Sequence, residues 1–575
     1  MKQPLAATIF LAAVNACGGA PTVSPEVNVA DPKLVPAPGP VLVILPSSVR
    51  TLVNTLDGPA EGPLDGRPRP TEEAIAVKDG KIFAVGSRNY VLSKSGPHAT
   101  VIELPGTVIV PGFVDTHAHL TGLGRALASP DLVGTRSIDE VVSRLRGAPP
   151  TELWLTARGW DQNDWPGAEF PNHEALSAAF PSRPVALRRV DGHAVWVNRE
   201  AMSLAGVNAA TKDPEGGLIV RSPSGEPTGV FVDTAMALID AKIPPSTIEQ
   251  TQAYLLAATA ACHRVGLTGV HDAGASAEQV AVMRSLASGG ELNLRVHVFL
   301  DGDDPTVEPL IEAGPRFEEL VSVAGVKLFA DGALGSRGAW LSAPYSDRPT
   351  TSGLPIVHGE ALAARVRRYA DKGFQVGVHA IGDAAATDVM NAFESVLVPG
   401  NERRFRIEHA QVVRPEDRKR MAALGVLAMV QPTHATSDMP WAEARLGPDR
   451  IRWAYAWRSL KNDGVRLALG SDFPVERPPV IDGLFAAVNR TDGAGKPAGG
   501  FYAEEALTAL EALQGFTVDA AYAGFVDKRR GQIIEGFDAD LTVLSADPVT
   551  TAPAELGKIE VLRTMVAGRF VYTRP

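Results

Sequence analysis

The sequence predicts an α/β protein: a (β/α)8 TIM-like barrel with a large insertion after its first strand, joined to a small β-sandwich domain built from both termini. Across the middle of the chain, short apolar runs alternate with helical stretches, which indicates βα units and a parallel sheet. At the two ends, strand-like runs are instead separated by Gly and Asp turns. The 575 residues exceed the size of one compact core, so more than one domain is expected.

The terminal β domain is predicted to combine residues 41–111 and 526–575. In the first segment, EAIAVKDGKIFAVGS places Asp79-Gly80 between two alternating apolar runs, which is a strong hairpin signal. In the second segment, GFDADLTVLSADP and VLRTMVAGRFVYT have the pattern of strands separated by turns. Because these segments flank the rest of the chain, we expect one small β-sandwich assembled from both ends.

The barrel is predicted to occupy residues 112–525. Its largest insertion, residues 121–265, separates the first and second strands, contains the strand-like segments WLTARGW and PVALRRV, and is expected to cap the site. A doubly wound open sheet would show similar periodicity, but no glycine-rich phosphate loop follows an early strand. Eight runs are candidates for the barrel strands: 108–114, 267–271, 294–300, 324–329, 374–379, 404–409, 426–431 and 466–471.

Polar residues lie at the predicted strand ends, where barrel enzymes carry their catalytic groups. His117 and His119 stand at i and i+2 of an extended segment, so both imidazoles point to the same side and can bind one cation. Imidazoles together with a carboxylate suit zinc and neighbouring transition metals. Any one of these residues alone has an ordinary structural explanation, but six follow strands one, four, five, six and eight in order: His117, His119, Lys327, His379, His409 and Asp472.

Lys327 lies inside the apolar run GVKLFADG. An unpaired buried lysine is costly as a cation, so its pKa should fall or its charge must be neutralised. Carbamylation by carbon dioxide is one chemical solution, because it turns the amine into a carboxylate-like metal bridge. A solvated position facing the edge of the sheet is the structural alternative.

Several blocks of the sequence resemble the amidohydrolase superfamily, and within it the amidohydrolase 3 branch that includes N-substituted formamide deformylases. They are PGFVDTHAHL, VKLFADGALGSRGAWL, VGVHAIGDAA, RIEHAQ, QPTHATSD, LALGSDFPVE and GFDADLTVLSADP, and they are spread over nearly the whole chain beyond its amino terminus. By this resemblance, His117 and His119 bind a first divalent metal, a carbamate on Lys327 bridges it to a second, and His379 and His409 hold the second ion. Zinc, as one or two ions, is the expected metal.

The resemblance also implies a mechanism. Asp472 contacts the first metal and acts as general base while metal-activated hydroxide attacks a substrate carbonyl. His193, in RVDGHAVWVN, and His434, in QPTHATSD, are further catalytic candidates that could contact the substrate, although packed loop positions are the alternative. His271 follows the second predicted strand and is a candidate for lining the site, whereas His263 near a helix end favours a charged capping role.

Composition and charge exclude several classes of partner and site. The formal net charge is −11 and no run of Lys and Arg forms a phosphate-binding stripe, so nucleic acid is not an expected partner. With only Cys17 and Cys262, neither a disulfide framework nor a CxxC metal site is available. The expected partner is a small amide-type substrate, and assembly into a homo-oligomer is left open.

The first 17 residues have the pattern of a lipoprotein-type signal peptide. An apolar stretch from Leu5 to Val14 follows Lys2 and is too short to span a bilayer. It leads into Val-Asn-Ala-Cys, which resembles the lipobox of bacterial lipoproteins, with Cys17 as the lipidated residue. Residues 18–40, rich in Pro, Ala and Val, predict a disordered linker. We therefore expect export and a lipid anchor at Cys17, facing the periplasm or the exterior of a bacterium; a soluble secreted or periplasmic protein, or a disordered cytosolic tail, are the alternatives.

These observations predict an exported metal-dependent hydrolase of carbon–nitrogen bonds other than peptide bonds, acting on an amide of the N-acyl or N-formyl type. An esterase or lactonase would use the same site, since the same nucleophile attacks an activated ester. A non-catalytic surface-anchored binding protein is the alternative from a different class. The sequence does not define the substrate, because specificity depends on loops and on the insertion.

Overall fold

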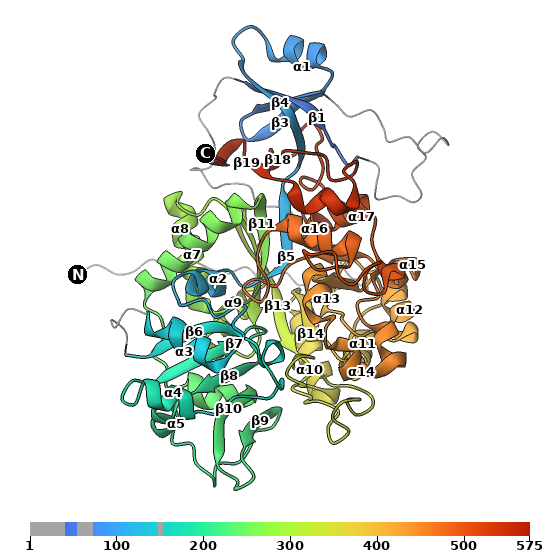
Figure 1. Cartoon of the computed structure of the whole chain (residues 1–575). Helices are drawn as coiled ribbons and strands as arrows, with labels where there is room; N and C mark the ends of the chain where they lie inside the picture. Colours follow the sequence, from blue (N-terminus) through green and yellow to red (C-terminus); the bar gives the residue numbers. More distant parts are fainter. Residues whose placement is uncertain (1–40, 54–72, 148–152) are drawn as a thin grey trace, which may run out of the picture.

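The computed structural model describes residues 41–53, 73–147 and 153–575, and it contains three β-sheets (Figure 1). The predicted signal peptide (1–17), including Cys17, and the predicted linker (18–40) lie outside the described residues. Within the described part, no helix combines the length and the apolar character needed to cross a bilayer.

The central element is a barrel of eight parallel strands whose spatial order follows their order in the chain. Each strand pairs in parallel with the next, as the alternating pattern of strands and helices predicts. The predicted fold class is confirmed. The strands are β5 (Phe113–Ala118), β11 (Leu267–Ala275), β12 (Arg295–Asp301), β13 (Val321–Phe329), β14 (Gln375–Ala380), β15 (Arg406–His409), β16 (Leu427–Val430) and β17 (Leu467–Leu469).

Helices pack around the outside of the barrel (Figure 1). Their ends carry clear sequence signals: α8 (Ala277–Gly289) starts with a capping box between Ser276 and Gln279 and stops at Gly290, which has a left-handed conformation. The other helices beyond β12 are α9 (Glu308–Ala313), α10 (Gly359–Asp371), α11 (Asp383–Glu394), α12 (Pro415–Leu424), α13 (Pro432–Asp438), α14 (Ala442–Arg450), α15 (Trp457–Asn462), α16 (Val480–Asn489), α17 (Ala509–Gly515) and α18 (Val518–Ala523).

Hydrogen bonds close the barrel between β17 and β5 at their carboxyl ends. The backbone N–H of Asp472 donates to the carbonyl of His117 at 2.7 Å. The N–H of His119 donates to the carbonyl of Phe473 at 2.9 Å. The buried Asp115 carboxylate ties the same two elements, because it accepts hydrogen bonds from the backbone N–H and the hydroxyl of Ser471. The first and last strands are therefore joined where the candidate ligands lie.

The first barrel strand lies further along the chain than predicted. Most of the predicted strand 108–114 belongs to β4 (Thr100–Pro111), which is part of the terminal sheet, and the barrel strand begins only at Phe113. The apolar run is continuous across both strands because both are buried, so hydrophobicity alone does not mark the boundary. The chain passes from one sheet to the other at Gly112, where a Cβ atom would lie 2.3 Å from Oγ1 of Thr268.

Strands from both ends of the described chain form one seven-stranded sheet. β4 pairs antiparallel with β18 (Leu541–Leu544), which joins the amino-terminal segment to the carboxyl-terminal one. The predicted hairpin is present, with positive φ at both Asp79 (50°) and Gly80 (76°), as tight two-residue turns require. The apolar residues Ile44, Ile109 and Met565 belong to one buried cluster, to which both segments contribute side chains. From edge to edge the strands are β20 (Arg569–Thr573), β19 (Val561–Val566), β18, β4, β1 (Leu42–Val49), β2 (Ala74–Lys78) and β3 (Lys81–Gly86), with α1 (Arg88–Ser95) beside β3.

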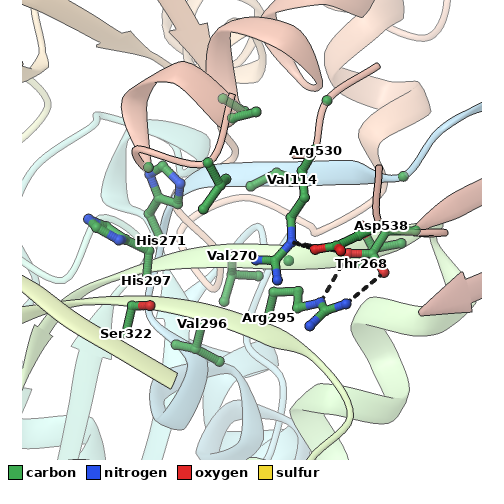
Figure 2. A pocket seen from close by; sticks show the side chains of 18 of the residues that line it. Val114, Thr268, Val270, His271, Arg295, Val296, His297, Ser322, Arg530 and Asp538 are labelled. Atoms are coloured by element: carbon green, nitrogen blue, oxygen red, sulfur yellow. Dashed lines mark hydrogen bonds and ion pairs between the residues drawn. The ribbon is translucent and has the colours of Figure 1, made fainter. Parts of the chain in front are cut away.

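Ion pairs attach the carboxyl-terminal segment to the amino-terminal end of the barrel (Figure 2). Arg295, the first residue of β12, donates to both carboxylate oxygens of Asp540, at 3.0 and 3.1 Å. Arg530 donates to Asp538 of the same segment at 2.8 Å and, across to the barrel, to the carbonyl of Glu319 at 3.2 Å. A small cavity of about 50 Å³ lies among these pairs. This end of the barrel is therefore tied down by charge pairs and lies opposite the carboxyl ends of the strands.

The insertion contains a five-stranded sheet, and the segments WLTARGW and PVALRRV supply two of its strands (Figure 1). Its end helices, α2 (Leu120–Leu127) and α7 (Ile248–Arg264), pack against each other and return the chain to the barrel. One face of the sheet is covered by a core that includes Trp160, Trp165 and Trp196. In spatial order the strands are β6 (Leu155–Trp160), β7 (Val185–Arg189), β8 (Ala194–Val197), β10 (Pro227–Asp233) and β9 (Gly217–Arg221), accompanied by α3 (Ile138–Arg146), α4 (Glu174–Ala179), α5 (Arg199–Ala205) and α6 (Ala237–Asp240).

Candidate metal centre

The candidate ligands that the sequence predicts come together at the carboxyl ends of the barrel strands. One ligand atom each from His117, His409 and Asp472 lie within 4.8 Å of one another and could hold a metal ion. His119 reaches the same carboxylate, with its Nε2 3.1 Å from Oδ1 of Asp472. Lys327 places Nζ 3.3 Å from Nε2 of His117. Residues distant in the sequence therefore converge because parallel strands end at one rim of the barrel.

A buried network of charged groups fixes the orientation of the His117 ring. Nδ1 of His117 contacts the carboxylate of Glu408, to which Arg406 donates at 2.9 Å. The pKa of Glu408 falls to about 2: burial would raise it, but the charges of Arg406 and His117 outweigh burial. The ionised carboxylate accepts the proton on Nδ1 and leaves the lone pair on Nε2 of His117 for a metal ion.

His379 and His409 form another side of the centre, with ring centroids 4.6 Å apart. Gln431 accepts a hydrogen bond from Nδ1 of His409 at 2.9 Å, and the carbonyl of Gly332 lies 3.4 Å from Nε2 of His379. In each ring the protein satisfies one nitrogen, so the other remains as a ligand atom. Burial lowers the pKa of both imidazoles well below 6.5, and neutral imidazole is the form that binds metal.

The Asp472 carboxylate has an unsatisfied oxygen at the middle of this cluster. Oδ1 lies 3.6 Å from Nε2 of His117 and 3.1 Å from Nε2 of His119, yet neither contact has hydrogen-bond geometry, and Oδ1 has no hydrogen-bond partner among the described residues. Nε2 of His434, 3.9 Å from Oδ2, is likewise buried without a hydrogen-bond partner in that part of the chain. Buried polar atoms are rarely left unpaired. An orphaned carboxylate oxygen surrounded by imidazole nitrogens fits a divalent metal ion.

Two of the candidate ligands have left-handed backbone conformations. His409, the last residue of β15, has a φ of 72°, and Asp472, just beyond β17, has a φ of 60°. Such values are uncommon outside glycine and cost on the order of 1–3 kcal/mol each. The strands therefore end with strained residues where their side chains enter the centre.

A cavity of about 1150 Å³ lies over the cluster, and its lining comes from both the barrel and the insertion. All six candidate ligands line it, and its size suits a small-molecule ligand. His193 also lines the cavity; its Nδ1 lies 2.7 Å from Oδ1 of Asp233, and its ring lies 5.0 Å from that of His379. The insertion thus delivers one predicted catalytic histidine to the centre and forms one wall of the cavity.

The structure places His271 away from this cavity. Because β11 continues to Ala275, His271 lies in the middle of its strand, where Arg406 donates to its Nδ1 at 2.9 Å. With His297 it lines the small cavity at the opposite end of the barrel (Figure 2). His271 was left open as a candidate for lining the site, and it does not line this cavity because its strand continues past the predicted end.

Several residues that orient the histidines were not identified from the sequence. Glu408 stands directly before His409 in RIEHAQ. An acidic residue next to a predicted strand-end ligand could have been identified from the sequence as a candidate for orienting a histidine. Asp233 gave no such signal, because its contact with His193 depends on how β8 and β10 pair within the insertion. Gln431 follows β16, and its contact with His409 depends on the parallel register of β15 and β16.

A (β/α)8 barrel with buried imidazoles and a carboxylate at its carboxyl end is the arrangement of a metal-dependent hydrolase. Residues 100–572 match the Amidohydrolase family, and the chain belongs to that family. It is 37% identical over 519 residues to "Putative amidohydrolase YtcJ" of Bacillus subtilis, covering 87% of this chain and 96% of that protein. The predicted resemblance to the amidohydrolase 3 branch is confirmed, and the protein is an enzyme, a hydrolase.

Two further similarities extend the comparison. The chain is 28% identical over 530 residues to N-substituted formamide deformylase of Arthrobacter pascens, covering 87% of this chain and 95% of that enzyme. Among solved structures, an uncharacterized metal-dependent hydrolase from Pyrococcus horikoshii has a TM-score of 0.72 at 27% identity, covering 89% of this chain and 99% of that one. The similarity therefore includes the terminal sheet and the insertion as well as the barrel.

Proposed function

We propose that the protein hydrolyses a carbon–nitrogen bond outside the peptide backbone, in a small amide of the N-acyl or N-formyl type. The observation that carries this proposal is the convergence of His117, His409 and Asp472, with Lys327, on a cavity of about 1150 Å³. The 28% identity to a formamide deformylase supports this type of substrate.

The proposed cofactor is zinc, as one or two ions. His117, His119 and Asp472 would hold one ion, and His379 and His409 would hold a second, because zinc favours imidazole nitrogen and carboxylate oxygen. When bound, such ions make a water molecule more acidic and polarise a carbonyl oxygen.

Lys327 is proposed to carry a carbamate, whose oxygens would serve as metal ligands. Its side chain is buried, and its Nζ contacts Nε2 of His117 at 3.3 Å and the ring of Phe329 at 4.7 Å. No carboxylate in the described ranges pairs with it. A carbamate forms when the neutral amine adds to carbon dioxide and loses one proton.

Labelling with ¹³C-bicarbonate should give a carbamate carbonyl signal by NMR that is absent from Lys327→Ala. An unlabelled but fully active enzyme would contradict this role.

The chain's own residues would move the protons. The Asp472 carboxylate takes a proton from the attacking water and returns it to the nitrogen of the leaving amine. Burial would raise the pKa of Asp472, but the contacts with the imidazoles of His117 and His119 outweigh burial and hold it well below its usual range, so the group starts as a base. His193, held by Asp233 through Nδ1, keeps Nε2 for a hydrogen bond to substrate, and Nε2 of His434 is a donor for the oxygen that gains charge.

A hydrolysis screen over N-formyl amines, N-acyl amines, hydantoin-like rings and aryl esters tests the proposal. We expect the wild-type enzyme to release free amine, and His117→Ala and Lys327→Ala to lose roughly 10³-fold in rate. Turnover of esters alone would favour an esterase or lactonase. Binding of amides without turnover by fully metallated protein would favour a binding protein, and full activity of Lys327→Ala would refute the bridging role.

We propose that the protein is exported and anchored to a bacterial membrane through a lipid on Cys17. The sequence that leads to Cys17 supports this proposal, since it resembles a lipobox. Growth with labelled palmitate should label the wild-type protein and leave Cys17→Ser unlabelled. Cys262→Ser is the matched control, because Cys262 is a buried free cysteine in the barrel domain. Label retained by Cys17→Ser would contradict the anchor.

A further inference from the structure

The inserted sheet turns one face toward the cavity above the metal centre. Thr156 and Arg158 alternate along β6 and both line the cavity. Arg188 occupies the register-paired position on the neighbouring parallel strand β7 and lines the cavity as well. Two guanidinium groups therefore stand side by side on this wall.

The two arginines differ in their partners. Arg188 donates to the carboxylate of Asp240 at 2.7 Å. Arg158 donates from Nη2 to the carbonyl of Val190 at 2.6 Å, but no carboxylate of the described residues lies within ion-pair distance, and its buried Nε has no hydrogen-bond partner there. Burial and the neighbouring Arg188 lower the pKa of Arg158 to about 10, which leaves it a cation at neutral pH.

The carboxylates that share the cavity with Arg158 already have other partners. Asp472 belongs to the metal centre. A partly buried charge without a counterion is costly, so an anion from outside the chain would stabilise Arg158. The remaining lining carboxylates pair as follows: Asp191 with Arg189, Asp233 with His193, Asp240 with Arg188, and Asp303 with Arg365.

Arg158 lies beside the turn that carries His193. Gly192 has a φ of 80°, and a Cβ atom added there would lie 3.5 Å from Nη1 of Arg158, so a glycine lets this turn approach the guanidinium closely. Arg158 and Asp472 line the same cavity, and the charge of Asp472 raises the pKa of Arg158. An anion held by Arg158 would therefore be near the bond that is cleaved.

We propose that Arg158 binds a carboxylate of the substrate, so that the enzyme acts on amides with a free carboxylate, such as N-formyl or N-acyl amino acids. The guanidinium of Arg158 would donate to this group through charge-assisted hydrogen bonds, because it lines the cavity and its Nε has no partner among the described residues. Trp154, Met236 and Ile243 line the same cavity and suit an apolar substituent. This inference rests on the proposed amide hydrolysis and adds the class of substrate.

Matched substrates test the inference. N-formyl- and N-acetyl-leucine, in both enantiomers, are compared with the corresponding leucinol amides, which lack the carboxylate. We expect the zinc-loaded wild-type enzyme to favour the carboxylate compounds in kcat/KM by roughly 10- to 100-fold, as expected for a hydrogen bond to a charged group. Arg158→Gln should lose that preference, so that both classes of substrate give similar kcat/KM, and Arg158→Lys should keep part of it.

Controls separate the possible failures. Arg199→Gln removes an exposed charge from the same insertion and should keep the full preference. Calorimetric binding of N-acetyl-leucine to Asp472→Asn, with and without Arg158→Gln, gives a readout that does not need turnover, and circular dichroism checks that each variant is folded. Equal turnover of both substrate classes by the wild type, or a preference preserved in Arg158→Gln, would overturn the carboxylate site and leave amide hydrolysis standing. Turnover of neither class would contradict the proposed function itself.

Discussion

Glu408 contacts Nδ1 of His117 although 291 positions separate the two residues in the sequence. Glu408 lies on β15 directly before His409, so one strand supplies both a candidate ligand and the carboxylate that orients another. Arg406, two residues earlier on the same strand, holds that carboxylate in turn and also donates to the carbonyl of Thr116 at 2.6 Å. Side chains of β15 therefore fix the orientation of the His117 ring.

The first prediction concerns this orientation. Glu408→Gln should weaken zinc binding by about 10- to 100-fold, because the amide no longer fixes the ring of His117 through a charged hydrogen bond. Competition with a chelator measures the affinity. Glu416→Gln, an exposed change on α12, is the control and should bind zinc as the wild type does. Unchanged affinity in Glu408→Gln would refute the positioning role.

The second prediction concerns the general base. Asp472→Asn should lower kcat by about 10²- to 10⁴-fold, the usual contribution of general acid–base catalysis. The backbone bond from Asp472 to the carbonyl of His117 does not depend on the side chain, so the fold should survive. Saturation kinetics and metal content are measured together. A variant that contains metal and keeps its rate within a factor of about ten would show that another group takes the proton.

The third prediction concerns the closure of the barrel. Ser471→Ala removes the hydroxyl that donates to the buried Asp115 carboxylate at 2.6 Å. Loss of this hydrogen bond leaves a buried acceptor with one partner fewer and should lower the free energy of unfolding by about 1–3 kcal/mol. Chemical denaturation measures the change, and Ser203→Ala, an exposed change on α5, should have little effect. Equal stability of the two variants would mean that the backbone bonds alone close the barrel.

The fourth prediction concerns pH. His263 lies in the last turn of α7, and burial lowers its pKa from 6.5 to about 4, so it is neutral at pH 7 and the expected charged cap was wrong. Below pH 6.5 the unfolded chain binds a proton there that the folded chain does not, so stability falls as the pH drops from 6.5 to 4, by on the order of 3 kcal/mol. His263→Gln should flatten the curve of melting temperature against pH in this range. His98→Gln, an exposed change, should follow the wild type, and parallel curves for all three proteins would contradict the shift.

The positions of the candidate ligands could be predicted because they depend on strand order alone. Parallel strands end at one rim, so Lys327, His379 and His409 were expected to meet once their strands were recognised. The contact of Glu408 with His117 could not be predicted, since it depends on which side chains face each other across the barrel. The boundary at Gly112 was also missed, because two buried strands of different sheets share one apolar run.

The arrangement of the two arginines on the cavity wall could not be predicted from sequence patterns, for a different reason. Arg158 and Arg188 occur in two separate strand-like segments, and only the parallel pairing of β6 with β7 places them side by side. Their different partners depend on Asp240, which lies beyond three further strands of the insertion. The left-handed conformations of His409 and Asp472 could not be predicted either. Such conformations are usually predicted from a glycine, and neither position is a glycine.

The closure of the barrel also determines when the metal centre can exist during synthesis. Asp115 and Ser471 are 356 residues apart, and Asp472 follows directly. A ribosome must therefore finish almost the entire barrel before the last ligand emerges, and a nascent or prematurely terminated chain holds only an incomplete set of donors.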